Sequence, residues 1–254
     1  MSEESNKVAI ITGASNEVSQ EIAKELAKKG TKIILADKDK EKLEAAANEI
    51  KSAGADVLAI ECDVKSADQV KDMIAKTVEK FGKVDFLINN DWTNKPSSFL
   101  DMTENIWDEV IDTNLRGPFN CCRETVPLMK KQKFGRIVNI ASVTGYTGSI
   151  SNIATNDVHF STSQGALLGF TRCMSSEVGR SKITANVVVL GFMDYPSLHD
   201  IYEPRAIKSG KALITVGKMG TPEDAAAAVM FLLSDEAKFV NGETMLVCGG
   251  GYMR

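Results

Sequence analysis

The chain has 254 residues, of which 43% are hydrophobic, 25% charged and 6% aromatic, the proportions of an ordinary soluble globular protein. Its 30 lysines and arginines against 34 aspartates and glutamates leave a net charge of -4, which disfavours binding to the phosphates of nucleic acids. No apolar run approaches the roughly 20 residues of a membrane helix, and the start, MSEESNK, lacks the basic and apolar parts of a secretion signal. We therefore expect a cytoplasmic protein that binds neither nucleic acid nor a membrane.

Cysteine and histidine are sparse and scattered. None of the five cysteines forms a CxxC pair, so we expect free, buried and inert thiols in a reducing compartment. The only two histidines, His159 and His199, lie far apart and outside any cysteine cluster. The sequence therefore predicts no metal site.

Short aliphatic and β-branched runs predict seven strands, at 8–12, 32–36, 56–61, 85–89, 136–140, 186–190 and 244–248. Most runs are continuously apolar, as expected for strands covered on both faces of a parallel sheet. The stretches between them space apolar residues three and four apart and predict helices. One covers 40–53, and Thr221 followed by Pro222 begins the last one. This alternation predicts one α/β domain over 1–254, a Rossmann-like, doubly wound parallel sheet of about seven strands.

The segment 191–220 interrupts the alternation, with Pro196, Pro204 and little periodicity. In a doubly wound fold an excursion near the end of the chain commonly covers a ligand cleft. A plain surface loop fits the sequence equally well, and we adopt a substrate-side loop region as the working interpretation.

The first predicted strand runs into Thr12-Gly13 and then a helix, where a dinucleotide-binding fold has its glycine-rich turn. Here the chain resembles the short-chain dehydrogenase/reductase family, whose turn reads TGxxxGxG. The resemblance is strongest to the branch of 3-oxoacyl-carrier-protein reductases and hydroxyacyl-CoA dehydrogenases. Further matching motifs extend almost to the C-terminus: Asp37, Cys62-Asp63-Val64, Asn89-Asn90, Asn114-Leu115-Arg116-Gly117, Ser142, Gly220-Thr221-Pro222-Glu223-Asp224, Asn241-Gly242 and Gly249-Gly250.

The resemblance implies an NAD site, but the turn departs from the family pattern. Only Gly13 remains of the three glycines, and Glu17 and Ser19 occupy the other two positions. A carboxylate about 4 Å from a pyrophosphate charge repels it by about 4 kcal/mol at an effective dielectric of 20. Without a compensating cation, this corresponds to a roughly thousandfold loss of affinity.

The loop after the fourth strand departs as well. Where the family has Asn-Asn-Ala-Gly, this chain has Asn89-Asn90-Asp91-Trp92. An indole and a second carboxylate then stand where the ribose and phosphates would pass, unless Trp92 turns outward and leaves the groove open. We therefore expect this chain to bind no cofactor. The remnants of the cofactor site are Gly13, Asp37, Asp63 and Asn89, and the residues that block it are Glu17, Ser19, Asp91 and Trp92.

The resemblance also locates the family's catalytic residues. Its Tyr exchanges a proton, its Lys four residues later lowers the Tyr pKa, and a Ser and an Asn complete the set. The register, fixed by Gly165-Ala166-Leu167-Leu168-Gly169-Phe170, puts Phe160 and Gln164 at the Tyr and Lys positions. Phe160 has no proton to give and Gln164 carries no charge, and loss of positioned acid–base catalysis costs about 10² to 10⁴ in rate. Ser142 and Asn114 remain, with a structural role favoured, so we assign no catalytic residue.

These departures favour a non-catalytic subunit of a hetero-oligomeric, NAD-dependent hydroxyacyl-CoA dehydrogenase. A paralogous, active short-chain-dehydrogenase partner would supply the Tyr, the Lys, the NAD site and the acyl-CoA site, in a heterotetramer. Among two-subunit members of the family, the chain resembles the inactive subunit of dehydrogenases of anaerobic toluene degradation. Two alternatives stay open: an autonomous oxidoreductase with a relocated proton donor, Tyr146 or Tyr195, and a non-enzymatic ligand sensor. His159 is a poor donor because one helical step rotates it about 100° from the face of residue 160.

Family members associate through the helices that carry residues 114 and 160 and through the C-terminal strand with its flanking helix. The resemblance therefore implies association surfaces rich in apolar side chains, for which the candidates are Ile106, Val110, Ile111, Phe119, Leu167, Leu168, Phe170, Phe231, Leu232 and Leu233.

Overall fold

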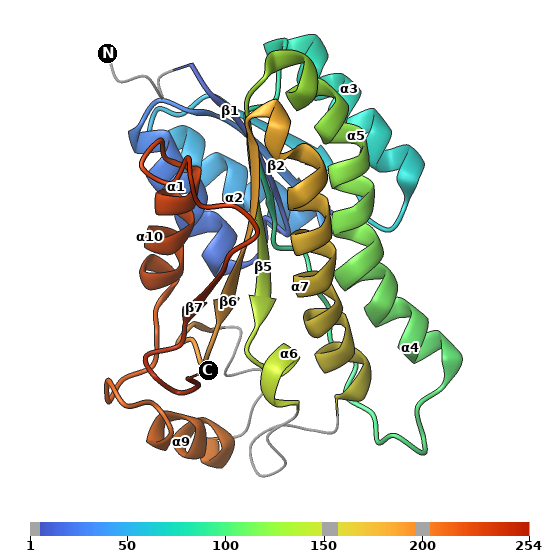
Figure 1. Ribbon diagram of the computed structural model, residues 1–254, viewed down its shortest axis with the longest axis vertical. Helices are drawn as coiled ribbons and strands as arrows, with labels where there is room; N and C mark the ends of the chain where they lie inside the picture. The colour runs from blue at the N-terminus through green and yellow to red at the C-terminus, as the bar shows by residue number, and fades with distance from the viewer. Residues whose placement is uncertain (1–5, 149–156, 197–203, 254) are drawn as a thin grey trace.

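A computed structural model describes residues 6–148, 157–196 and 204–253. Seven strands form one parallel sheet in the order β3-β2-β1-β4-β5-β6-β7 (Figure 1). The predicted fold class, a doubly wound Rossmann-like α/β sheet, is confirmed. The strands are β1 (Val8–Thr12), β2 (Lys32–Asp37), β3 (Val57–Glu61), β4 (Phe86–Asn89), β5 (Gly135–Ser142), β6 (Ile183–Leu190) and β7 (Thr244–Val247).

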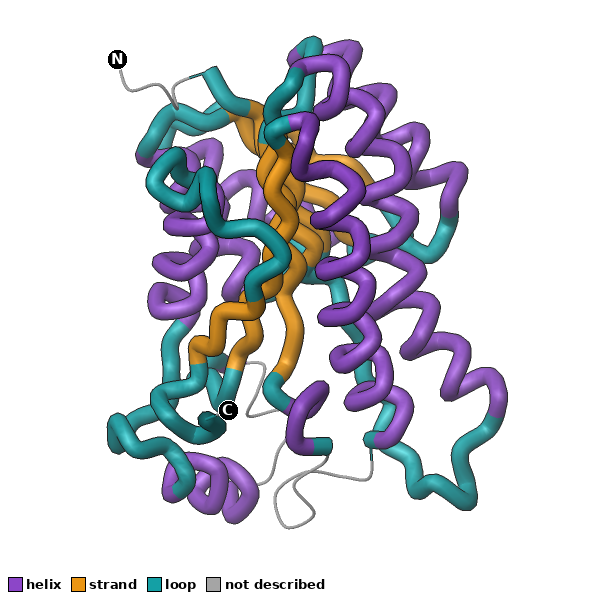
Figure 2. Tube along the Cα trace, in the orientation of Figure 1, coloured by secondary structure: helices purple, strands orange, loops and turns teal. Residues whose placement is uncertain are grey.

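Helices cover both faces of the sheet, as Figure 2 shows. On one face α1 (Glu17–Lys28), α2 (Lys40–Ser52) and α10 (Pro222–Leu233) pack into one apolar cluster with the strands. On the other face lie α3 (Ala67–Phe81), α5 (Gly117–Gln132) and α7 (Val158–Val178), which pack into a second. The remaining helical elements are α4 (Glu104–Ile111), a π-helical turn (Asp112–Arg116), α6 (Thr144–Thr147), a 3₁₀ turn (Gly179–Ser181) and α9 (Pro204–Ala212).

Burial explains the continuously apolar strands, because β1 and β4 are buried along their whole lengths. Local signals end and begin the helices. The predicted N-cap Thr221 is confirmed as part of a capping box with Asp224, and Pro222 is the first helical residue. Gly82 ends α3 in the left-handed conformation, with φ of 78°.

The described part of the segment 191–220 holds more structure than its weak periodicity predicted. It contains α9, and Met193 forms a β-bridge with Gly220. Phe192, Ile214 and Met219 belong to a small apolar cluster of their own. Helix α9 was not predicted, because it is amphipathic over only nine residues, too short for a clear repeat; the role of 191–220 as a substrate-side loop region stays a prediction.

The cysteines are free thiols, as predicted. Cys62, Cys121 and Cys122 are buried, and burial raises the pKa of the Cys62 and Cys122 thiols to about 12. The expectation that all five are buried was wrong for Cys173, which is exposed on α7, and for Cys248, which is only partly buried. Within the described residues, no three His, Cys, Asp or Glu side chains gather as metal ligands, and no helix is both long and apolar enough to span a membrane.

Several of the apolar candidates for association surfaces lie inside this chain. Val110, Leu167, Leu168, Leu232 and Leu233 are buried in its own core, so the expectation that they face a partner was wrong. Phe119 on α5 and Phe231 on α10 remain exposed, by 43% and 42%.

Candidate functional site

The expected site residues follow strands that end at the same edge of the sheet. β2 and β3 lie on one side of β1, and β4 to β7 on the other, so the chain changes direction between β1 and β4. In doubly wound sheets, ligands bind outside the carboxyl ends of the strands at such a switch point. Gly13 follows β1, Asn89 ends β4 and Ser142 ends β5.

The turn after β1 is tied to the loop after β4. Gly13 has a φ of 66°, and a Cβ there would lie 2.6 Å from the carbonyl oxygen of Asn90, so only glycine fits. The Ser19 side chain is fully buried. Its hydroxyl donates to the Thr12 carbonyl (3.2 Å) and accepts from Asn90 Nδ2 (2.8 Å). Ser19, which we expected in the groove, thus lies in the framework behind the turn.

The N-terminus of α1 is already capped by a side chain of this chain. Asn16 Oδ1 accepts from the Val18 N–H (2.9 Å) and from Asn90 Nδ2 (3.2 Å). An N-cap satisfies one of the N–H groups that a helix offers to an anion. The partly exposed Glu17 places a carboxylate in the same first turn, where it stabilises the helix. Our sequence reasoning missed Asn16, although Asn before an amphipathic helix is an N-cap signal.

The acidic remnants of the cofactor site hold backbone turns. Asp37 is buried and accepts from the N–H groups of Ser15 and Asp39, both at 2.9 Å. Asp63 Oδ1 accepts from the Lys65 N–H (3.0 Å), and Asp63 Oδ2 forms an ion pair with Lys65 Nζ at 3.8 Å. Both carboxylates therefore have partners within this chain.

Asn89 is buried under the cleft and linked to the neighbouring strand. Its Nδ2 donates to Asn139 Oδ1 (2.7 Å), and the Cys122 Sγ lies 3.6 Å away. This hydrogen bond fixes the end of β4 against β5, and the loop with Asp91 and Trp92 begins directly after it.

Asp91 sits in a largely enclosed position beside other acids. Burial, followed by the charge of Asp37, raises the pKa of the Asp91 carboxyl to about 7, against an opposing effect of Lys38. The sequence alone predicted a second full negative charge here. With this pKa the carboxyl is only about half ionised at neutral pH, so Asp91 repels a phosphate less than the sequence predicted.

Trp92 and Phe160 are in contact at the carboxyl edge of the sheet. The centroids of their rings are 5.7 Å apart with the planes at 62°, an edge-to-face contact. Trp92 comes from the loop after β4, and Phe160 lies on α7 with 9% of its surface exposed. The indole of Trp92 therefore lies against the ring that replaces the family's Tyr, rather than away from it.

The residue at the family's Lys position supports the end of β5. The buried Gln164 accepts the Ser142 backbone N–H at its Oε1 (2.8 Å), and its Nε2 donates to Ser163 Oγ (3.4 Å). The Ser142 hydroxyl in turn accepts from Thr144, from its N–H at 3.3 Å and its hydroxyl at 3.1 Å. Such a Ser–backbone contact is a common turn motif.

Asn114 joins the loop after β4 to α7. Its Oδ1 accepts the Thr93 N–H (2.8 Å), and its Nδ2 donates to the Thr93 carbonyl (3.1 Å) and to Ser163 Oγ (3.0 Å). Both amide protons are thereby used. The π-helical turn that carries Asn114 is a kind of irregularity often found at functional sites. Thr93 and Ser163 were missed because no sequence pattern announces these long-range bonds.

The other candidate donors are placed differently. His159 is fully buried and its Nε2 is 2.9 Å from the Lys95 carbonyl, which can only accept, so Nε2 carries the proton. Tyr146 on α6 stacks on Tyr252, with ring centroids 5.2 Å apart. Tyr195 packs beside the apolar cluster of Ile214 and Met219. His199 lies outside the described residues.

Comparison with known proteins gives one consistent result. Residues 13–252 match the family model described as "Enoyl-(Acyl carrier protein) reductase". The chain is 36% identical over 248 residues to 3-oxoacyl-[acyl-carrier-protein] reductase FabG of Staphylococcus aureus, covering 97% of this chain and 98% of that protein. This chain belongs to the short-chain dehydrogenase/reductase family.

Two further relatives are each 32% identical to this chain. FabG of Thermotoga maritima is 32% identical over 244 residues, 96% of this chain and 97% of that protein. The (2S)-[(R)-hydroxy(phenyl)methyl]succinyl-CoA dehydrogenase subunit BbsD of Thauera aromatica is 32% identical over 248 residues, 96% of each chain. The comparisons thus support the oxidoreductase class of this family for the chain.

Proposed function

We propose that this chain is a non-catalytic subunit of a hetero-oligomeric, NAD-dependent hydroxyacyl-CoA dehydrogenase. In this proposal a paralogous subunit supplies the Tyr, the Lys and the NAD site, and the two form a heterotetramer. The observation that carries the proposal is the contact between Trp92 and Phe160. The first comes from the loop that would line the cofactor, and the second replaces the proton donor.

The chemistry of the four catalytic positions supports this proposal. Ser142, Phe160, Gln164 and Asn114 offer no group that titrates near neutral pH. The amide of Gln164 is engaged with Ser142, and that of Asn114 with Thr93 and Ser163. A nicotinamide ribose would lack the ammonium that the family provides, and the aromatic pair lies where the cofactor would approach Phe160. On these grounds the residues present do not fit a bound dinucleotide.

A relative named as a subunit supports the hetero-oligomeric part of the proposal. BbsD of Thauera aromatica is by its name one subunit of a hydroxyacyl-CoA dehydrogenase. The specific form of the proposal is that this chain is the inactive counterpart in a dehydrogenase of this kind, acting on an aromatic succinyl-CoA in toluene degradation.

The test is to purify the chain alone and together with the short-chain dehydrogenase that co-purifies with it from the native host. NADH binding is followed by fluorescence, and oxidation of a hydroxyacyl-CoA by formation of NADH. We expect neither saturable binding nor turnover with the chain alone, and both with the complex. Saturable NADH binding and turnover by the isolated chain would refute the proposal.

One alternative within the enzyme class has a specific observation in its favour. Tyr146 lies four residues after Ser142, on α6, whose Gly145 is in close contact with the backbone of α7 beside Gln164. If Tyr146 is a relocated proton donor, Tyr146→Phe abolishes a measurable turnover of the isolated chain, whereas Tyr195→Phe retains it.

A further inference from the structure

A pocket of about 670 Å³ opens at the edge of the sheet opposite the candidate cleft. Arg136 and Thr184, which line it, are the second residues of β5 and β6, whereas Ser142 is the last residue of β5. Six residues along a strand span roughly 20 Å. The pocket is therefore separate from the cleft, and its volume is within the range of small-molecule sites.

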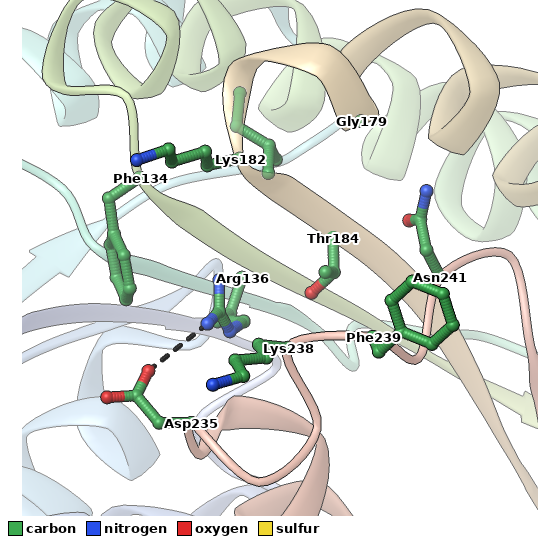
Figure 3. A pocket seen from close by; sticks show the side chains of 10 residues that line it. Phe134, Arg136, Gly179, Lys182, Thr184, Asp235, Lys238, Phe239 and Asn241 are labelled. Carbon is green, nitrogen blue, oxygen red and sulfur yellow. Dashed lines mark hydrogen bonds and ion pairs between the residues drawn. The ribbon is translucent and has the colours of Figure 1, made fainter.

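Two buried polar groups of this pocket lack a partner among the described residues. Arg136 is 4% exposed and Thr184 is 6% exposed, and neither Arg136 Nε nor Thr184 Oγ1 has a hydrogen bond within that part of the chain. A buried donor without a partner costs free energy that a bound acceptor would recover. Figure 3 shows both side chains in the middle of the pocket, between Phe134 and Phe239.

The charge of the lining favours an anion. Arg136, Lys182 and Lys238 are opposed by one carboxylate, that of Asp235. Asp235 is 3.3 Å from Arg136 Nη2 and its side chain is 65% exposed, so it neutralises only the outer side of the guanidinium. Arg136 Nη1 donates to the carbonyl of Gly135 (3.1 Å), which leaves its Nε–H for a ligand.

The aromatic walls of the pocket favour an anionic ligand that also carries a flat, apolar group. Phe239 on the rim is 99% exposed, so its ring is uncovered and can be contacted by a ligand that enters the pocket. Phe134 forms the opposite wall, with the guanidinium of Arg136 4.6 Å from its ring centroid. An arginine held against an aromatic ring is preorganised to receive a planar oxyanion.

We propose that this pocket binds an aromatic oxyanion, with its carboxylate or phosphate on Arg136 Nε and Thr184 Oγ1 and its ring against Phe239. The site is independent of the cleft and of the assignment of this chain as a non-catalytic subunit. No bond is made or broken in it.

The test uses the full chain and four probes followed by NMR: benzoate, phenyl phosphate, inorganic phosphate and the uncharged benzyl alcohol. We expect benzoate or phenyl phosphate to bind at least tenfold more tightly than inorganic phosphate, and benzyl alcohol not to bind. The stronger of the two aromatic probes identifies the source of the oxyanion as a carboxylate or a phosphate ester. Equal binding of benzyl alcohol, or no binding of any aromatic anion at millimolar concentration, would overturn the proposal.

Two variants test the assigned atoms. Arg136→Met should weaken binding of the better probe at least tenfold. Thr184→Val removes a buried hydroxyl without changing the shape of the side chain, so it should weaken the probe severalfold while leaving the melting temperature of the free protein equal or higher. This second variant keeps the test valid if Arg136→Met does not fold. The matched control is Arg123→Met, because Arg123 also lies over a phenylalanine, 5.2 Å from the Phe119 centroid, and pairs with Glu124.

The control should bind the probe as the natural chain does. Binding that is unchanged in both Arg136→Met and Thr184→Val contradicts the site. A second reading of Phe239 is that another protein chain covers it. Phe239→Ser that changes the mass of the assembled protein, with no change in probe affinity, would favour that reading and overturn ours.

Discussion

The residues that replace the family's functional side chains are compatible with one another. Trp92 contacts Phe160, Gln164 holds Ser142, and Ser19 is bonded to Asn90. The Trp92–Phe160 contact joins two substituted positions, whereas Gln164 and Ser19 bond to residues that match the family pattern, so each replacement has a partner within this fold.

Asp91 gives a prediction for stability against pH. Its carboxyl has a pKa of about 7 in the folded chain, above its ordinary value of 3.8, so the folded state binds the proton more tightly than the unfolded state. Stability is therefore lost as the pH rises from about 4 to 7. Asp91→Asn should leave stability unchanged below pH 4 and raise the free energy of unfolding at pH 8 by at most about 4 kcal/mol.

Urea unfolding at pH 4, 6 and 8 measures this difference. Asp101→Asn is the matched control, because Asp101 is an exposed acid whose hydrogen bonds are to Ser98 on the surface. If Asp91→Asn has the same effect at all three pH values, the carboxyl does not titrate as described.

At the scale of elements, the sequence predicted all seven strands because long apolar runs mark buried parallel strands. The predicted run 186–190 began too late, since β6 starts at Ile183 and includes Thr184, a polar residue at the pocket. The register of α7 predicted which residues stand at positions 160 and 164. The inward direction of Trp92 could not be predicted, because it depends on packing against Phe160, 68 positions away in sequence.

The loop after β4 and helix α7 are in contact through Trp92 and Phe160. This contact predicts what happens when the family's Tyr and Lys are restored at positions 160 and 164. Phe160→Tyr with Gln164→Lys should give no detectable turnover of a hydroxyacyl-CoA with NAD, because Trp92 still lies against position 160. Positioned acid–base groups contribute about 10² to 10⁴ in rate only where the substrate and cofactor can reach them. Turnover by this double variant would show that the obstruction has been overestimated.

A further variant separates obstruction of the cofactor site from the absence of the catalytic Tyr and Lys. Adding Glu17→Gly, Asp91→Ala and Trp92→Gly to the double variant removes the carboxylate from the turn after β1 and restores the family's residues in the loop after β4, and it should produce saturable NADH fluorescence binding. Circular dichroism and a melting curve show whether each variant is folded, and Asn94→Ala in the same loop is the control that should leave NADH unbound.

At the scale of the whole molecule, the two edges of the sheet and its outer helices have separate features. The altered cleft is at the carboxyl edge, the basic pocket at the amino edge, and exposed phenylalanines lie on α5 and α10. Because Phe119 and Phe231 are on outer helices, they can be buried by a partner without any change in the core. The proposal of a hetero-oligomer therefore has a physical counterpart in side chains that this chain does not cover.

These two side chains give the last prediction. Phe119→Ser or Phe231→Ser should weaken association with the co-purified partner by about fivefold each, because burying half a phenylalanine contributes about 1 kcal/mol. Because more than half of each residue is covered within this chain, the melting temperature of the isolated variants is measured as well, which separates lost stability from lost association. Native mass spectrometry of dilution series measures the association, and Leu100→Ser, at a position 92% exposed on the loop before α4, is the control. If Leu100→Ser weakens the complex as much as the two phenylalanine variants, the assembly is not made through α5 and α10.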